Sequence, residues 1–298
     1  MKTPLIDQER QLRFQMWQNL HDAGGPRGLS PELIRQHGVY GGASGVWMDK
    51  KRTITLTTDG IGVTVGLLHT GETYADDLSV DGVIYHYPIT DRKGHDEAEI
   101  AATKAARTFA LPIFVITLPR PTAKTRDVHL GWVEDWDDAA HQFLISFGGE
   151  PSSAPTSPSL AVEEKLEVPF TLTTKKSAVK KAIFTRQGQQ RFKFHVLKRY
   201  GLCCAVCDIN IPELLDAAHL RPKSANGSDD PRNGIALCAL HHRALDAGLF
   251  RINPDTLDVT AAPHLSLTAL RITRTSLEYM AQKPHHDALS WRWDASGL

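Results

Sequence analysis

The sequence has few cysteines, no long hydrophobic run and no net charge. Only 4 cysteines occur in 298 residues, and three of them are neighbours, at Cys203, Cys204 and Cys207. In a large chain, a few clustered cysteines favour a metal site over a disulfide framework. No stretch of about 18 apolar residues occurs, so no transmembrane helix and no membrane partner are predicted.

The N-terminus also lacks the features of a targeting segment. The opening MKTPLIDQERQLRF is charged and has no apolar core, so no secretory signal is predicted and the expected localisation is cytoplasmic. The composition is 41% hydrophobic and 23% charged, which is ordinary for a globular protein. A chain of 298 residues is long enough for two such domains.

Acidic residues are missing from one long stretch of the chain. Overall, 34 basic residues balance 34 acidic ones, which argues against a general polyanion binder. Between Glu167 and Asp208, however, there is no acidic residue. Such a basic stretch can neutralise phosphates, although a solvated helix face is the alternative interpretation. Its basic residues are Lys175, Lys176, Lys180, Lys181, Arg186, Arg191, Lys193, Lys198 and Arg199.

A segment rich in Ser, Pro and Ala, GGEPSSAPTSPSLAVEEK, predicts a linker over residues 148–165. It separates a domain at 1–147 from a domain at 166–298. In the first domain, helical periodicity and β-branched runs predict an α+β fold with a curved or barrel-like sheet. The expected helices are 6–25 and 97–111, and the expected strands are 38–42, 52–58, 60–70, 81–88 and 112–119.

The second domain is expected to open with a helix over residues 186–201. A β-β-α order follows, with a strand pair around LLDAAHL, a polar loop KSANGSDDPRNG and a short helix in CALHHRALDAG. Gly248 is placed to cap the end of that helix. A last strand, LFRI, completes the pattern.

Two pairs of metal ligands flank this β-β-α pattern. They are Cys204-x-x-Cys207 and Cys238-x-x-His241. An x-x spacing lets one tight turn aim two ligands at the same ion, and four such ligands close a tetrahedral structural Zn²⁺ site. Cys203 is out of phase with this spacing and is left outside the site.

The segments DAAHLRPKS, DPRNGIALC and HHRALDAGLF resemble the HNH, or ββα-metal, nuclease family over roughly residues 180–255. The resemblance implies that His219 is the general base that activates water. It also implies that His242 binds a catalytic divalent metal such as Mg²⁺ or Mn²⁺, and that Asn233 holds the intervening loop. A zinc-containing structural module without nuclease chemistry is the plain alternative.

Asp246 lies four residues after His242, so on a helix the two share a face and are expected to grip one cation together. A surface charge is the alternative for Asp246. Where the family often has a second ligand, this chain has Ala218, which predicts a metal site with fewer protein ligands. Asp216 is expected to point elsewhere.

In the first domain, GETYADDLSVDGVIYHYP is similar to the pocket region of SRA (YDG) domains, which hold a flipped 5-methylcytosine. GVYGGASGVW and AEIAATKAARTFALPIFVIT extend the similarity over roughly residues 36–120. It implies that Tyr74 and Tyr87 sandwich the base and that Asp77 accepts a hydrogen bond from its amino group. Pro88 and Ile89 depart from the family pattern, which leaves the choice among 5-methyl-, hydroxymethyl- and other modified cytosines open. Alternatively, Tyr87 is simply a strand residue.

Together these resemblances imply a modification-dependent, type IV-like restriction endonuclease. The first domain would bind double-stranded DNA carrying modified cytosine, and the HNH domain would hydrolyse a phosphodiester. Since one HNH site cuts one strand, a homodimer is a further hypothesis. The alternatives are an HNH nuclease with another DNA specificity and a modified-DNA binding protein with a degenerate nuclease module.

Overall fold

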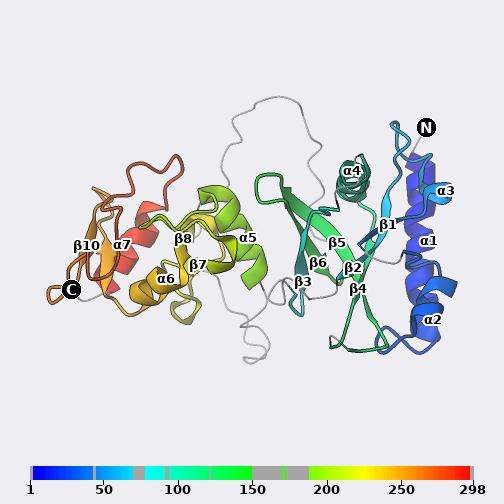
Figure 1. The fold of residues 1–298 in the computed structure, drawn as a ribbon, viewed down its shortest axis with the longest axis horizontal. Coiled ribbons are helices and arrows are strands. Elements are labelled where there is room, and N and C mark those ends of the chain that lie inside the picture. Colours follow the sequence, from blue (N-terminus) through cyan, green and yellow to red (C-terminus); the bar gives the residue numbers. More distant parts are fainter. Residues whose placement is uncertain are drawn as a thin grey trace. The chain divides into compact units, whose positions relative to one another are not determined.

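A computed structural model describes residues 3–42, 45–69, 78–90, 94–120, 122–149, 170, 173 and 188–295. The chain divides into two compact units, Met1–Ala161 and Val162–Leu298 (Figure 1). The division falls inside the segment predicted as a linker, most of which lies outside the described residues. Across the described ranges, every helix is too short or too polar to cross a bilayer.

The first unit is built on one mixed sheet. The strand order is β1-β2-β4-β5-β6-β3, in which β2 and β4 are parallel and all other neighbours are antiparallel. The strands are β1 (Val46–Met48), β2 (Thr64–His69), β3 (Gly82–His86), β4 (Ile113–Thr117), β5 (Asp127–Asp137) and β6 (Gln142–Phe147). The helices are α1 (Thr3–Asp22), α2 (Pro31–Gln36), α3 (Lys50–Thr53) and α4 (His95–Thr108).

This sheet curls. Its edge strand β3 lies four strands away from β2, yet the hydroxyl of Tyr85 on β3 is 3.5 Å from the carbonyl oxygen of Leu68 on β2. A register shift between Val133 and Asp135, where β5 pairs with β6, adds a local bend. The prediction of an α+β fold with a curved sheet is therefore confirmed.

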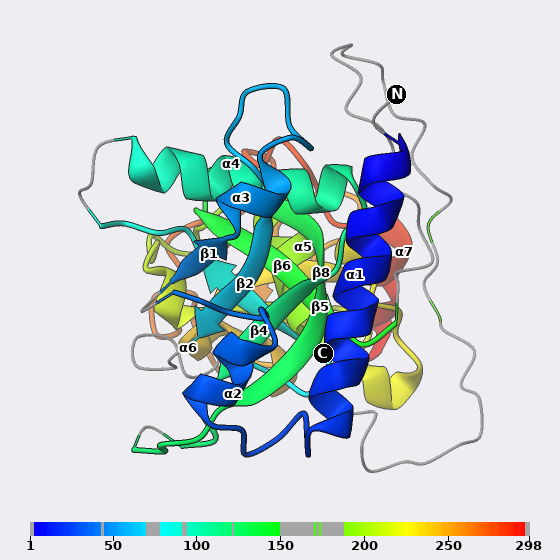
Figure 2. The same cartoon turned by 90° about the vertical axis from the view of Figure 1, so that its right-hand side faces the viewer.

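Both faces of the sheet are covered, as the burial of strand β4 shows. All five of its residues are buried, as in strands that lie between two layers. Phe114 and Ile116 pack with α1 and α2, whereas Ile113 and Val115 share a second cluster with Ala106 of α4. Figure 2 shows α1 lying along the sheet and α4 crossing it at one end.

Two strand predictions in this unit are wrong. Residues 52–58 begin in α3 and continue as turns, because Asp49 caps α3 by accepting a hydrogen bond from the Arg52 amide, and the Thr53 hydroxyl bonds back to the Asp49 carbonyl. Residues 38–42 are in no strand either. The predicted Gly-Gly stop of the first helix is confirmed, since Gly24 has a φ of 112° and the Gly25 amide donates to the Leu20 carbonyl.

The second unit has the predicted β-β-α order at its centre. Strand β7 (Leu215–His219) pairs antiparallel with β8 (Gly234–Cys238), and α6 (Ala239–Asp246) follows directly. Helix α6 ends as predicted, since Gly248 has a φ of 67° and the Leu249 amide donates to Ala244. The other elements are α5 (Gln189–Tyr200), β9 (Phe250–Ile252), β10 (Val259–Ala261), α7 (His286–Ala295) and short 3₁₀ turns at Pro212–Leu214, Lys223–Ala225 and Pro231–Asn233.

Helix α5 packs directly on the start of β8. A Cβ atom at Gly234 would lie 2.6 Å from the side chains of both Phe192 and Val196, so only glycine allows this approach. Both α5 side chains are buried in the core of the second unit. Helix α5 thus holds one end of the hairpin formed by β7 and β8, and this is the end at which His219 and Asn233 lie.

A buried arginine ties α1 to the sheet of the first unit. Arg13 is fully buried, its Nε lies 2.7 Å from Glu9, and its Nη1 donates to the carbonyls of Thr64 and Pro112 at 2.8 Å each. Burial lowers the pKa of Arg13, an effect that the neighbouring Glu9 opposes. We expect Arg13→Met to destabilise this unit by about 3–5 kcal/mol, because it leaves a buried carboxylate and two carbonyls short of a partner.

Hydrogen exchange measures this effect separately in each unit. Peptides from β2 and β4 should lose protection in Arg13→Met, while peptides from β7 and β8 should not change. The control is Arg35→Met on α2, where the side chain is exposed. Equal protection in the two variants would contradict the prediction.

Candidate active site and metal cluster

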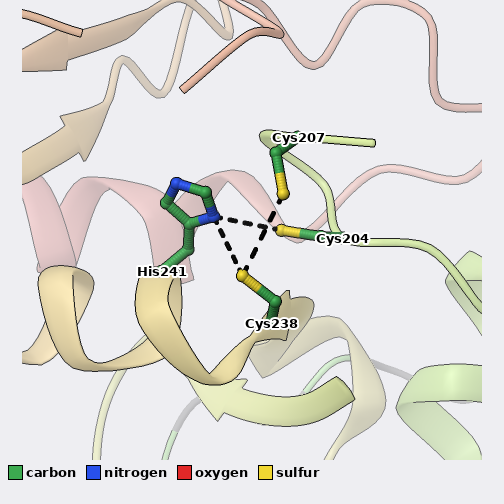
Figure 3. A group of neighbouring side chains, drawn as sticks. All are labelled: Cys204, Cys207, Cys238 and His241. Carbon is green, nitrogen blue, oxygen red and sulfur yellow. Dashed lines mark hydrogen bonds between the residues drawn. The ribbon is translucent and has the colours of Figure 1, made fainter. Parts of the chain in front are cut away.

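The structure brings the four predicted zinc ligands together (Figure 3). Cys204 and Cys207 lie in the turn before β7, Cys238 ends β8, and His241 is in the first turn of α6. All four are buried, and their ligand atoms lie within 4.8 Å of one another. The Nδ1 atom of His241 is 3.5 Å from Cys204 Sγ and 3.1 Å from Cys238 Sγ, and Cys207 Sγ is 4.0 Å from Cys238 Sγ.

These distances suit a tetrahedral ion. With Zn–S at about 2.3 Å and Zn–N at about 2.0–2.1 Å, ligand atoms lie roughly 3.6–3.8 Å apart. The Nε2 atom of His241 is 3.0 Å from the Leu270 carbonyl, to which it can only donate, so Nδ1 is left free to bind a cation. Burial raises the pKa of the Cys207 thiol to about 12. Ionised thiolates in this position therefore need a cation beside them.

Cys203 lies outside this cluster. Its sulfur accepts a hydrogen bond from Arg274 at 3.2 Å, and the same guanidinium donates to the Cys204 carbonyl at 2.7 Å. Tyr279 donates to the Ala205 carbonyl at 2.7 Å. These contacts hold the cysteine turn from outside, and they could not be anticipated because Arg274 and Tyr279 follow some seventy residues later.

His219 is the last residue of β7, and its imidazole is held on two sides. The ring stacks on Phe192 of α5, with centroids 3.7 Å apart and planes 11° apart. Its Nε2 atom is 3.2 Å from Asp229 Oδ1, and Asp229 Oδ2 is 2.5 Å from Lys223 Nζ. Burial raises the pKa of Asp229, but the hydrogen bonds with His219 and Lys223 outweigh it and lower that pKa overall. Asp229 was not predicted from the sequence, since no spacing rule links it to His219.

Asn233 closes the loop between β7 and β8. It is fully buried, its Oδ1 accepts from the Arg221 amide at 3.0 Å, and its Nδ2 donates to the carbonyls of Arg221 and Ser228 at 3.1 and 2.9 Å. The loop is tight, because a Cβ at Gly227 would lie 1.7 Å from the Arg221 carbonyl oxygen. Asn233 therefore pairs three backbone groups of the loop, which are buried or partly buried.

His242 lies between two carboxylates. Its Nδ1 is 3.2 Å from Asp216 on β7, and its Nε2 is 3.5 Å from Asp246 on α6. The hydrogen bond that His242 donates to Asp216, supported by the charge of Asp246, raises the pKa of His242. Asp246 also lies 3.4 Å from Arg292 of α7.

The expectation that Asp216 points elsewhere is wrong. Because β8 leads directly into α6, the strand paired with β8 lies beside that helix, and Asp216 reaches His242 from there. Ala218 is fully buried in the apolar core. His242 thus has the carboxylate of Asp216 beside it, although Ala218 offers no polar group.

The site therefore consists of two groups of side chains on one hairpin and helix. The first is His219 with Asp229 and Lys223, and the second is His242 with Asp216 and Asp246. Within the described residues, no hydrogen bond or ion pair joins His219 to His242. A general base and a group of cation ligands are the chemical functions that such a pair can supply.

Of the three residues predicted for the base pocket, Tyr74 and Asp77 lie outside the described residues. Tyr87 is 6% exposed, and its ring packs on Phe143 with centroids 4.5 Å apart. Its hydroxyl donates to Asp138 at 2.8 Å, and both burial and this hydrogen bond raise the pKa of Tyr87. The ring is not open to a base in this structure.

Residues 204–253 match the model of a protein family described as HNH endonuclease. No curated protein matches the chain. Among solved structures, the chain is similar to one titled "Modification dependent TagI restriction endonuclease", with 17% identity over 91% of this chain and 93% of that chain and a TM-score of 0.35. That TM-score is too low to establish a shared fold. The family match confirms the prediction of a metal-dependent DNA endonuclease of the HNH type.

The buried cluster predicts one tightly bound metal ion per chain. We expect Cys238→Ser to lose this ion and to destabilise the second unit strongly, because structural zinc sites contribute roughly 10–16 kcal/mol in small zinc domains. Metal analysis of purified protein together with thermal unfolding would measure both effects. Cys203→Ser is the matched control and should keep the metal. Loss of metal from both variants, or from neither, would contradict the assignment of ligands.

Proposed function

We propose, from the HNH endonuclease domain at residues 204–253, that this protein cleaves double-stranded DNA that carries modified cytosine. The second unit would hydrolyse the phosphodiester, and the first would recognise the modified base. The observation that carries the nuclease assignment is the arrangement of His219, Asn233 and His242 on one hairpin and helix, where two carboxylates flank His242.

His219 is proposed as the general base. An imidazole suits this task because its ordinary pKa lies near working pH. A water oxygen would attack phosphorus while its proton passes to a ring nitrogen of His219. The bond from phosphorus to the leaving oxygen would break, and the resulting alkoxide would take a proton from solvent. Asn233 would keep the loop that carries the partners of His219 closed.

Asp216, His242 and Asp246 are proposed to hold the catalytic divalent cation. Asp216 and Asp246 lie against different nitrogens of the His242 ring, so a cation would take one of these nitrogens and the carboxylate beside it. Carboxylate ligands suit Mg²⁺, Mn²⁺ or a similar ion, and such an ion supplies Lewis-acid stabilisation of the phosphoryl group when bound. Because Asp216 raises the pKa of His242, a proton competes with the cation for this histidine. The carboxylates that attract the cation therefore also favour the proton that competes with it for His242.

We further propose that Cys204, Cys207, Cys238 and His241 hold a structural Zn²⁺. Three thiolates and one imidazole saturate a tetrahedral ion and leave no position open for a substrate, which is typical of structural sites. The ion would join the cysteine turn to the start of α6, and the next residue of α6 is His242. Its role would be to fix this helix in place.

Recognition of modified cytosine is proposed from the resemblance of residues 36–120 to SRA domains, with Tyr74, Asp77 and Tyr87 as pocket residues. Recognition of another DNA feature is the second candidate, and the burial of Tyr87 favours it. Since each chain has one HNH domain, double-strand cleavage would require two protomers or two successive encounters. A homodimer is proposed as the simpler arrangement.

Cleavage of one plasmid tests both halves of the proposal. We expect cutting of the 5-methylcytosine or 5-hydroxymethylcytosine form, with Mg²⁺ or Mn²⁺, and no cutting of the unmodified form. His219→Ala should lower the rate by at least about 10²-fold, which is the usual size of a general-base contribution. Asp216→Asn should also lower the rate, because it removes a carboxylate from the proposed cation site. Asp255→Asn is the control, because that carboxylate is exposed and pairs only with His286 in the described part of the chain.

The outcomes separate the alternatives. Equal cutting of all three plasmids would keep the nuclease and discard recognition of modified cytosine. Binding of modified DNA without cutting under either metal would indicate a binding protein with a degenerate nuclease module. Full activity of His219→Ala would remove His219 from the base role.

A further inference from the structure

The imidazole of His219 has one nitrogen engaged and one nitrogen free of any partner among the described residues. Nε2 lies 3.2 Å from Asp229, and Phe192 covers a face of the ring. The side chain of His219 remains 15% exposed. Because Nε2 is engaged by the protein, Nδ1 is the nitrogen that remains for a water molecule.

Asp229 is itself fixed from several sides. Lys223 lies 2.5 Å from its second carboxylate oxygen, and Gly188, at the start of α5, would place a Cβ only 3.1 Å from that same oxygen. The Gly188 backbone has a φ of 82°, which glycine adopts without strain. The paired lysine keeps the carboxylate ionised, in agreement with its lowered pKa. An ionised carboxylate only accepts hydrogen bonds, so Nε2 must carry the hydrogen.

We propose that Asp229 is a positioning residue that fixes His219 as its Nε2–H tautomer and thereby makes Nδ1 the atom that takes the proton from water. Lys223 holds the carboxylate in place. When Nδ1 accepts the proton, the ring becomes an imidazolium, and Asp229 stabilises its charge through the Nε2–H bond without taking the proton itself. This inference rests on the proposed role of His219 as general base and adds the atom that reacts and the residues that select it.

Asp229→Asn is the sharpest variant, because asparagine has the same shape but can turn its NH₂ group towards Nε2. It would then favour the wrong tautomer, with the hydrogen on Nδ1. We expect kcat on plasmid DNA to fall roughly 10- to 10³-fold, below the loss of about 10⁴-fold seen when the same change is made in a serine-protease triad. KM for DNA should not rise, since Asp229 acts through His219. Asp229→Glu should restore part of the lost kcat.

A spectroscopic measurement reports the tautomer directly. In ¹⁵N-labelled protein, the imidazole signals that disappear in His219→Ala identify this residue. We expect the wild type to show hydrogen on Nε2 and Asp229→Asn to show hydrogen on Nδ1. A wild-type His219 with its hydrogen on Nδ1 would overturn the proposal without any variant at Asp229.

Asp230→Asn is the matched control. Asp230 directly follows Asp229 in the sequence, but its carboxylate pairs with Arg232 at 2.7 Å and caps the 3₁₀ turn at Pro231–Asn233. It should change thermal stability while kcat stays within about threefold of the wild type and the His219 tautomer does not change. An equal loss of kcat in both asparagine variants would show that the loop, and not the carboxylate on His219, is responsible.

Failure of the two proposals can be told apart. A fully active His219→Ala removes the general-base role, whatever Asp229 does. The other outcome is that His219→Ala is inactive while Asp229→Asn keeps the wild-type kcat and the wild-type tautomer of His219. This outcome would leave the nuclease assignment standing and would overturn the positioning role of Asp229.

Discussion

The antiparallel pairing of β7 with β8 is the constraint on which the site depends. It sets Leu215 opposite Cys238 and His219 opposite Gly234, so the two ends of one short hairpin carry different functional groups. At one end, Cys238 joins the buried cluster and leads into α6. At the other end, Asn233 closes a polar loop by satisfying its backbone groups. A shift of register by one residue would separate both sets of partners at once.

The two units differ in what their cores contain. The first has a sheet whose two faces are covered by apolar clusters, and it buries the Arg13 and Glu9 pair together with further polar side chains such as Glu99. The second packs its apolar core around a metal-ligand cluster and carries its polar side chains in loops that side-chain hydrogen bonds hold in place.

Much of the second unit could be predicted from the sequence because its signals are local. The x-x spacing of Cys204 with Cys207, the stop at Gly248 and the shared helix face of His242 and Asp246 all lie within a few residues. Asp216 and Asp229 were missed because their partners lie 26 and 10 residues away and are set by strand pairing and loop closure. The short helix α3 was mistaken for a strand because a single cap at Asp49 outweighs β-branched composition.

The adjacency of His241 and His242 on α6 has a practical consequence. One histidine points into the buried cysteine cluster and the other faces the carboxylates of Asp216 and Asp246. If each holds its own ion, the two ions are bound through consecutive residues of the same helical turn. Titration with a strong chelator would then inactivate the enzyme in two ways, by removing the exchangeable ion and by loosening the helix that binds it. Restoring activity would require both ions, because the one that stabilises α6 and the one that serves the reaction bind different side chains.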